Sequence, residues 1–244
     1  GSTGDGYRFA RSAGHTVVEP RGSLVPLCAA GDLCQRLQGL SLRNAGLRVY
    51  ENDKKIYSDF GELLFTHFGV SGPLILSTSA HMRRFGAARY RLEIDLKPAL
   101  DEQTLDRRLL SDFAKRANSD FINAFDELLP RKLIEPFVDL TGVPPREKVH
   151  DLTKAQRRRV LELMKALPVE ITGPRPVAEA IVTSGGVSVK EVRPSTLESK
   201  LLPGLYFAGE VLDVDAYTGG FNLQIAWSTG RLAGLSAAGY GKQK

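Results

Sequence analysis

The sequence has few cysteines and no recognisable metal-binding pattern. Its 244 residues include only Cys28 and Cys34, which are six positions apart, with no C-x-x-C pair and no neighbouring histidine. That spacing excludes the common zinc sites and a redox dithiol, so we expect two buried, reduced thiols and no metal. Asp213 and Asp215 form a D-x-D sequence, but the further oxygen ligands of a calcium or magnesium loop are missing.

Long hydrophobic runs are missing too. The apolar stretches are only a few residues long, too short to span a bilayer, and no signal peptide opens the chain. We therefore expect a cytoplasmic protein with no membrane partner. Lysine and arginine total 33 against 28 acidic residues, a net charge of +5. This mild excess permits nucleic acid binding without indicating it.

Two catalytic or binding signatures are also missing. Ser71 has Gly69 and Gly72 nearby but not the G-x-S-x-G spacing of a hydrolase. The dinucleotide fingerprint G-x-G-x-x-G does not occur, since Gly4-Asp5-Gly6 is not followed by a third glycine at the right spacing. The chain opens instead on the turn-rich string GSTGDGY, which normally connects elements, so we expect a preceding segment in the natural protein.

The periodicity of apolar residues predicts strands in the first part of the chain and helices in the middle. A short helix over 7–13, with Phe9 and Ala10 inward and Gly14 at its end, precedes a strand at 15–18. Period-two alternation then predicts an antiparallel sheet or barrel between 24 and 96, with a turn at Asn52-Asp53.

From residue 101 to 140 the period becomes helical, which predicts a small helical subdomain. Thr153 and Gln156 form a capping box that predicts a helix over 154–166. Strands are then expected at 169–172, 177–183 and 187–192. The apolar run 205–208 is typical of a strand covered on both faces in a parallel sheet, and a final helix is expected over 222–238.

The most informative residues follow that apolar run. Gly209 and Glu210 come directly after it, where ligands gather in open α/β sheets. Gly219 and Gly220 then precede the last helix, whose free N–H groups favour negative charge. Taken singly, the glycines could be a tight turn and Glu210 a helix cap. Their order along the chain favours a ligand site.

Four segments of the chain resemble one protein family. They are GSTGDGY (1–7), GELLFTHFGVSGP (61–73), VTSGGV (182–187) and the stretch 204–224 with its GE and TGGFNLQ sequences. The chain is similar to the BaiN-like flavoproteins, also known as aminoacetone-oxidase-like FAD-binding enzymes. The resemblance implies a mixed α/β and α+β fold: a partial glutathione-reductase-like FAD/NAD(P)-binding domain at 1–20 and 181–244, with an insert at 21–180 made of a β-barrel and a helical subdomain at about 100–150.

The resemblance also implies a function and a site. The chain would be part of a bacterial FAD-dependent oxidoreductase that transfers hydride through flavin N5 to or from a small molecule, with NAD(P)H as a possible reductant. The cofactor-binding residues it implies are Thr3, Gly4, Asp5, Gly185, Gly186, Gly209, Glu210, Gly219, Gly220, Phe221, Asn222 and Leu223. Because the fingerprint is missing, we expect this chain to be inactive alone and to need the missing N-terminal segment as its partner.

Other polar residues allow further interpretations. His67, between aromatic residues, and Ser71 are candidates for catalytic residues facing the substrate, although a hydrogen-bonded structural histidine is an equal alternative. His15, His81 and His150 are expected at surfaces or element ends. Arg157-Arg158-Arg159 makes a basic patch that is more often a solvated helical face than a nucleic-acid surface. The alternative function, a nucleic-acid- or protein-binding module built on the insert, rests on this patch.

Overall fold

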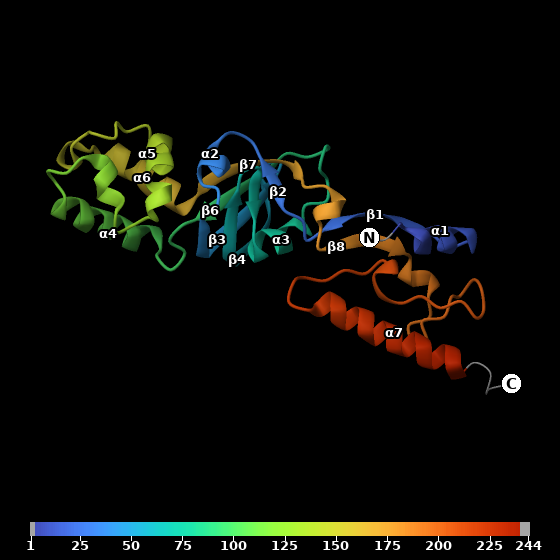
Figure 1. Ribbon diagram of the computed structural model, residues 1–244. Coiled ribbons are helices and arrows are strands. Elements are labelled where there is room, and N and C mark those ends of the chain that lie inside the picture. The colour runs from blue at the N-terminus through green and yellow to red at the C-terminus, as the bar shows by residue number, and fades with distance from the viewer. Residues whose placement is uncertain (1–2, 240–244) are drawn as a thin grey trace. The chain divides into compact units, whose positions relative to one another are not determined.

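The computed structural model describes residues 3–239 and divides the chain into two compact units. Unit 1 comprises residues 1–25 and 175–244, and unit 2 comprises residues 26–174 (Figure 1). The sequence analysis places these boundaries at 20/21 and 180/181, so the expected insert is a few residues longer than unit 2 at each end. Within 3–239, no helix has both the length and the apolar character needed to cross a lipid bilayer.

A closed six-stranded barrel is built from the first and last parts of unit 2. Alternation places Ala45, Leu47 and Val49 inside it, all at most 2% exposed. The strands follow the order β2-β5-β4-β3-β6-β7 around the barrel. Their bounds are β2 (Leu27–Ala29), β3 (Ser41–Glu51), β4 (Lys54–Thr66), β5 (Gly69–Ser71), β6 (Tyr90–Asp95) and β7 (Leu167–Pro174), with the short helices α2 (Leu33–Arg36) and α3 (Pro73–Ser79) between them.

The barrel closes where its first and last strands meet. Leu27 of β2 pairs with Pro174 of β7, and on its other side with Val70 of β5. Gly69 allows this close approach, because a Cβ atom on it would lie 2.2 Å from the carbonyl oxygen of Leu27. Gly69, the first glycine of the sequence THFGVSG, is therefore explained by the close pairing of β5 with β2.

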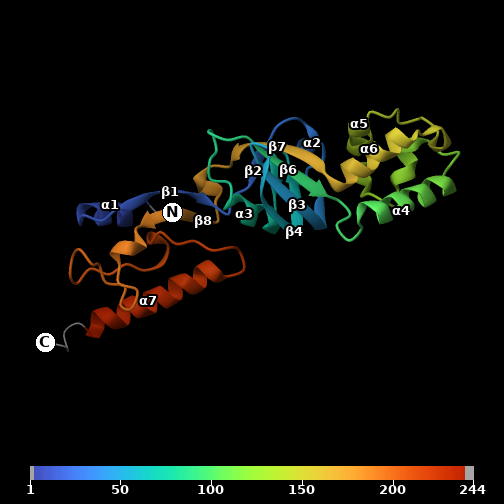
Figure 2. The same cartoon turned by 180° about the vertical axis from the view of Figure 1, so that it is seen from behind.

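A helical piece lies at one end of the barrel, between β6 and β7 in the sequence (Figure 2). Leu105, Leu109 and Phe113 repeat at helical spacing and are buried, and they join the barrel side chains in one continuous core. Its elements are α4 (Glu102–Lys115), the 3-10 turn η1 (Phe121–Phe125), α5 (Arg131–Thr141), the turn η2 (Val149–Asp151) and α6 (Lys154–Lys165).

Unit 1 has a smaller core around Val187, Phe207 and Leu212. Its two strands pair antiparallel, and the described residues contain no parallel ladder beside them. Its elements are α1 (Asp5–Ser12), β1 (Val17–Ser23), η3 (Val177–Glu179), β8 (Val182–Val187), η4 (Val189–Glu191), η5 (Gly209–Val211) and α7 (Phe221–Gly239). The long helix α7 is apolar yet leaves Leu223, Trp227 and Leu235 more than half exposed.

The structure confirms the barrel, the helical piece, the turn at Asn52-Asp53 and the capped helix α6, whose capping box is complete. Other expectations were wrong. Phe9 is 63% exposed, not inward, whereas Ala10 is buried. The stretches 177–181 and 188–192 contain the turns η3 and η4 in place of strands.

The predicted parallel strand at 205–208 was also wrong. Phe207 is buried, but Tyr206 makes only an isolated antiparallel bridge with Glu198. An apolar run does not distinguish a strand covered on both faces from an extended segment that buries alternate side chains. The glutathione-reductase-like assignment of unit 1 stays a prediction.

Candidate functional site

The segments singled out in the sequence at both ends of unit 1 lie beside each other. The hydroxyl of Tyr7 on α1 donates to the carbonyl oxygen of Glu210 at 3.3 Å and lies 3.4 Å from the hydroxyl of Thr183 on β8. A Cβ atom on Gly6 would lie 3.1 Å from the Val211 side chain. The turn-rich opening of the chain thus contacts the Gly209-Glu210 segment, although Gly1 and Ser2 lie outside the described residues.

Strand β8 reaches the same segment through its glycine pair. Gly186 has φ of +134°, and a Cβ atom there would lie 2.6 Å from the carbonyl oxygen of Val211. The N–H of Asp213 donates to the carbonyl of Val187 at 2.9 Å. A Cβ atom on Gly185 would meet the Glu19 carbonyl at 2.6 Å. Gly186 therefore allows close packing of β8 against residues 211–212, and Gly185 allows close packing against β1.

The Gly209-Glu210 segment rests on α7. The N–H of Gly209 donates to the hydroxyl of Thr229 at 2.9 Å, and a Cβ atom on Gly209 would lie 3.7 Å from Ala226. The side chain of Glu210 is exposed and forms no hydrogen bond or ion pair with any residue in 3–239. The segment that rests on α7 therefore carries a carboxylate with no partner among the described residues.

The start of α7 carries unpaired donors. Its first intrahelical bond runs from the N–H of Gln224 to the carbonyl of Gly220 at 3.0 Å. Among described residues, the N–H groups of Phe221, Asn222 and Leu223 have no acceptor, as expected at a helix N-terminus. A Cβ atom on Gly220 would meet nothing within 4 Å, so this end of the helix is open.

The loop before α7 is fixed by Asn222. Its side-chain oxygen accepts from the N–H of Ala216 at 2.8 Å, and its side-chain nitrogen donates to the Ala216 carbonyl at 2.7 Å. Nearby, Ser23 donates to Asp215 at 2.7 Å. The sequence analysis gives Asn222 a role in cofactor binding through its backbone only. It does not predict that the side chain anchors this loop.

At the other end of the chain, the opening turn is held by local contacts. Thr3 donates to the carboxylate of Asp5 at 2.9 Å, and this carboxylate also pairs with Arg8. Gly4 caps the start of α1 with φ of +76°. The elements α1, β8 and η5, which contain suggested cofactor-binding residues, thus contact one another within unit 1, and η5 contacts α7 at Ala226 and Thr229. Their role in binding stays a prediction.

His67 and Ser71 lie in the other unit. His67 is exposed in the turn between β4 and β5, where its ring packs edge-on against Phe68. Ser71 ends β5 and pairs with Leu64 across the barrel sheet. Neither side chain has a hydrogen-bonding partner among residues 3–239. The described contacts of unit 2 therefore do not pair His67 and Ser71 as an acid and a base.

A buried histidine in unit 1 was not anticipated. His15 lies at an element end, between α1 and β1, as expected, but it is only 4% exposed; its Nδ1 lies 3.0 Å from Glu191 and its Nε2 lies 2.7 Å from Ser199. The order of contacts resembles a hydrolytic triad, but Ser199 is 2% exposed and its oxygen accepts the N–H groups of Leu201 and Leu202. This cluster fixes a turn, and no sequence spacing could have revealed residues so far apart.

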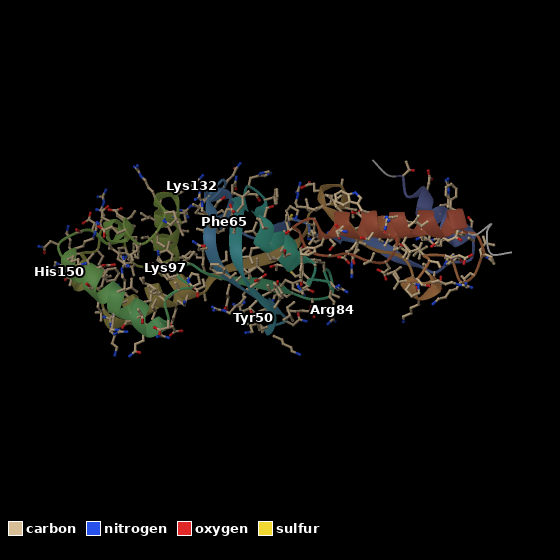
Figure 3. The ribbon with its side chains drawn as sticks, turned by 90° about the horizontal axis from the view of Figure 1, so that it is seen from below. Tyr50, Phe65, Arg84, Lys97, Lys132 and His150 are labelled. Atoms are coloured by element: carbon tan, nitrogen blue, oxygen red, sulfur yellow. The ribbon has the colours of Figure 1, made fainter. Side chains whose placement is uncertain are left out.

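The other two histidines are less buried. His81 is half-buried and stacks on Tyr57 with ring centroids 4.0 Å apart. His150, labelled in Figure 3, lies in η2, and its Nδ1 contacts the Ala117 carbonyl at 2.8 Å. In the described part of the chain, no three His, Cys, Asp or Glu side chains are grouped so that they could hold a metal ion.

The basic patch on α6 is largely neutralised. Arg157 pairs with Asp106 at 3.0 Å, and Arg158 pairs with Glu102 at 3.1 Å and Glu162 at 3.0 Å. These partners come from α4 and from α6 itself. Hydrogen bonding to Glu162 and the charge of Glu102 raise the pKa of Arg158 above its ordinary value. The arginine run is thus mainly part of the α4–α6 contact.

Three relatives match nearly the whole chain. It is 30% identical over 240 residues to a 3-dehydro-bile acid delta(4,6)-reductase of Clostridium scindens, covering 98% of this chain and 58% of that protein. Ribosomal RNA dihydrouridine synthases of Haemophilus influenzae and Escherichia coli are 31% and 30% identical, over 97% and 94% of this chain and 56% and 55% of their own lengths. The chain thus spans little more than half of each relative.

A family match covers the barrel and the helical piece. Residues 21–182 match the family described as HI0933-like protein barrel and H2TH domain. These residues contain all six barrel strands and helices α4 to α6. Because the match extends over more than half of the 244 residues, the chain belongs to the HI0933-like family of proteins with a barrel and an H2TH domain.

Proposed function

We propose that the chain is part of an FAD-dependent oxidoreductase and that unit 1 contributes one side of the flavin site. The observation that carries this proposal is the open start of α7, where three unpaired N–H groups follow two glycines. In support, the contacts of Tyr7, Gly186 and Gly209 join α1, β8 and η5, and Gly209 contacts α7 at Ala226 and Thr229.

The residues present suit the groups that FAD would offer. The N–H groups of residues 221–223 would donate to the carbonyl edge of the flavin ring, and the helix dipole would favour negative charge there by about 0.3–1 kcal/mol. The free carboxylate of Glu210 would accept hydrogen bonds from ribityl hydroxyls. FAD itself would supply hydride transfer through N5.

The relatives suggest the class of reaction. The names of all three describe saturation of a carbon–carbon double bond, in a 3-oxo steroid for one and in uridine for two. In each substrate that bond is conjugated to a carbonyl group. We therefore propose reduction of a conjugated alkene, in which hydride adds to one carbon and a proton to the other, with NAD(P)H as the candidate electron donor. His67 and Ser71 remain candidate residues on the substrate side.

The first test is FAD affinity in the protein purified from its native gene. Replacing Glu210 by Ala removes a charged hydrogen-bond acceptor, worth about 1.5–3 kcal/mol. We expect FAD to dissociate roughly 10- to 100-fold more readily, as measured by the visible absorbance of bound flavin during dialysis.

Glu19→Ala is the matched control, because Glu19 is an exposed carboxylate on β1 that pairs with Arg11. Equal FAD affinity in the wild type and in Glu210→Ala would remove Glu210 from the site. A colourless native protein that cannot be reconstituted with FAD would reject the proposed function as a whole.

The alternative, a nucleic-acid-binding module built on Arg157–Arg159, has less support. Arg157 and Arg158 are held by carboxylates of α4 and α6, so phosphates would have to displace these ion pairs. Salt-dependent RNA binding that disappears when all three arginines are neutralised would revive it.

A further inference from the structure

A small cavity separates the first residues of β3 from the helical piece of unit 2. Its volume is about 190 Å³, roughly six times the volume that one water molecule occupies in the liquid. An apolar wall is formed by Leu42, Leu96, Leu128, Leu129, Pro130 and Leu133. The polar lining consists of Ser41, Arg43, Asn44 and Lys97, and no acidic residue contributes.

A β-bulge directs two of these polar side chains. Leu42 pairs with Leu63 and Ala45 pairs with Gly61, so Arg43 and Asn44 together lie opposite a single residue of β4. Bulges change the direction of side chains locally and are enriched beside functional sites. Within 3–239, the side chain of Arg43 has no ion-pair or hydrogen-bond partner.

Lys97 brings a second cation to the cavity from the segment after β6, between the strands and the helices (Figure 3). Its ammonium group has no partner among the described residues. The nearby carboxylate of Asp95 is already occupied, because it pairs with Lys165 at 2.6 Å and accepts the backbone N–H of Lys97 at 2.9 Å. Burial, with repulsion from Arg108, lowers the pKa of Lys97.

Two other cavities in the described part of unit 2 are different. The one between α4 and α6 is lined by Glu102 and Asp106, which already pair with arginines. The one beside α5 contains Arg36, which is bonded to Asp139, and also Glu135. The cavity at Arg43 and Lys97 is set apart from them by two unpaired cations and the lack of any carboxylate.

We propose that this cavity binds a phosphate group, held by Arg43 and Lys97 with hydrogen bonds from Asn44 and Ser41. A guanidinium matches the geometry of a phosphate, and an ammonium adds a point charge. The apolar wall would accept the sugar or base attached to the phosphate. The phosphate could belong to an RNA backbone or to a free nucleotide. The site lies in unit 2 and does not depend on the flavin proposal.

The experiment compares the 244-residue chain with the double variant Arg43→Gln/Lys97→Gln. The probes are a fluorescein-labelled, uridine-rich single-stranded RNA, followed by anisotropy, and uridine monophosphate, followed by amide chemical shifts. The matched control is Lys54→Gln/Lys55→Gln, which removes two exposed cations of β4 that lie beside the opposite end of β3. If the double variant unfolds, the single variant Arg43→Gln, which changes only an exposed side chain, replaces it in the same experiment.

If the phosphate belongs to RNA, the site variant should bind RNA about tenfold more weakly than the control, and the slope of log affinity against log salt should fall by about one. If it belongs to a nucleotide, uridine monophosphate should shift the amides of residues 41–44 in the wild type only, with no difference in RNA affinity. The proposal would be overturned if the control and site variants lost RNA affinity equally, or if the wild type responded to neither probe.

Discussion

Cys34 is buried against the barrel wall, and this has a chemical consequence. Burial raises the pKa of its thiol from 9.0 to about 11. At pH 8 the reactive thiolate should therefore be about a hundredfold scarcer than in an unperturbed thiol. In a Cys28→Ser variant, which leaves Cys34 as the single cysteine, we expect alkylation by iodoacetamide to be at least that much slower than in the urea-unfolded chain.

The pH dependence of that reaction has a definite direction. Since the thiolate is the nucleophile, the rate should keep rising with pH up to the raised pKa, provided the fold persists. Rapid modification of folded Cys28→Ser at pH 8, with a plateau near pH 9, would mean that Cys34 is accessible. Mass spectrometry of the modified peptide reports the rate directly.

Single residues were predicted unevenly from the sequence. The burial of Cys34 was predicted, whereas Cys28 is only partly buried, and the convergence of Glu210 with Gly219 and Gly220 stays a prediction. The burial of His15 was not predicted, because its partners Glu191 and Ser199 are more than 170 positions away and no local pattern connects them. Hydrogen bonds from the side chain and N–H of Thr16, and from His15, lower the pKa of Glu191 below its ordinary value.

The helix α6 shows how strongly a local signal can determine an element. Thr153 accepts from the N–H of Gln156 at 3.2 Å, and the Gln156 side chain accepts from the N–H of Thr153 at 2.7 Å. Thr153→Ala removes one half of this exchange, and we expect the free energy of unfolding to fall by about 1 kcal/mol. Urea denaturation followed by circular dichroism would measure it.

An exposed threonine elsewhere provides the comparison for that variant. Thr3→Ala changes a side chain outside any helix cap of unit 2 and should leave the stability of that unit unchanged. An equal loss in both variants would show that the effect does not come from the cap.

Elements with a strong period were predicted well, and those that depend on distant partners were not. The alternation in β3 and the helical repeat in α4 are visible within ten residues. The run 205–208 looked like a central strand, but the neighbours that would make it one are missing from the described residues, and it pairs only at Tyr206. Local pattern fixes the conformation of a segment, whereas its partners decide whether it joins a sheet.

Unit 2 should fold as an independent protein. Its first and last strands pair directly at Leu27 and Pro174, and its barrel and helices share one core. A fragment of residues 26–174 would therefore keep every strand pairing of the barrel. We expect a cooperative thermal transition and dispersed amide resonances, whereas a broad transition with binding of a hydrophobic dye would contradict this.

The 244-residue chain should hold FAD poorly. No G-x-G-x-x-G turn occurs in its sequence, so the pyrophosphate has no such helix N-terminus to bind. We expect the cofactor to be lost on gel filtration of this chain. Stoichiometric FAD in the purified 244-residue chain would contradict the prediction.

The exposed helix α7 carries its own optical probe. Trp227 is the single tryptophan of the sequence, and 66% of it is exposed. Its emission in this chain should be that of a water-exposed indole, and anything that covers the helix should move the emission to shorter wavelength. Burial of α7, or energy transfer to a bound chromophore, can therefore be followed without a label.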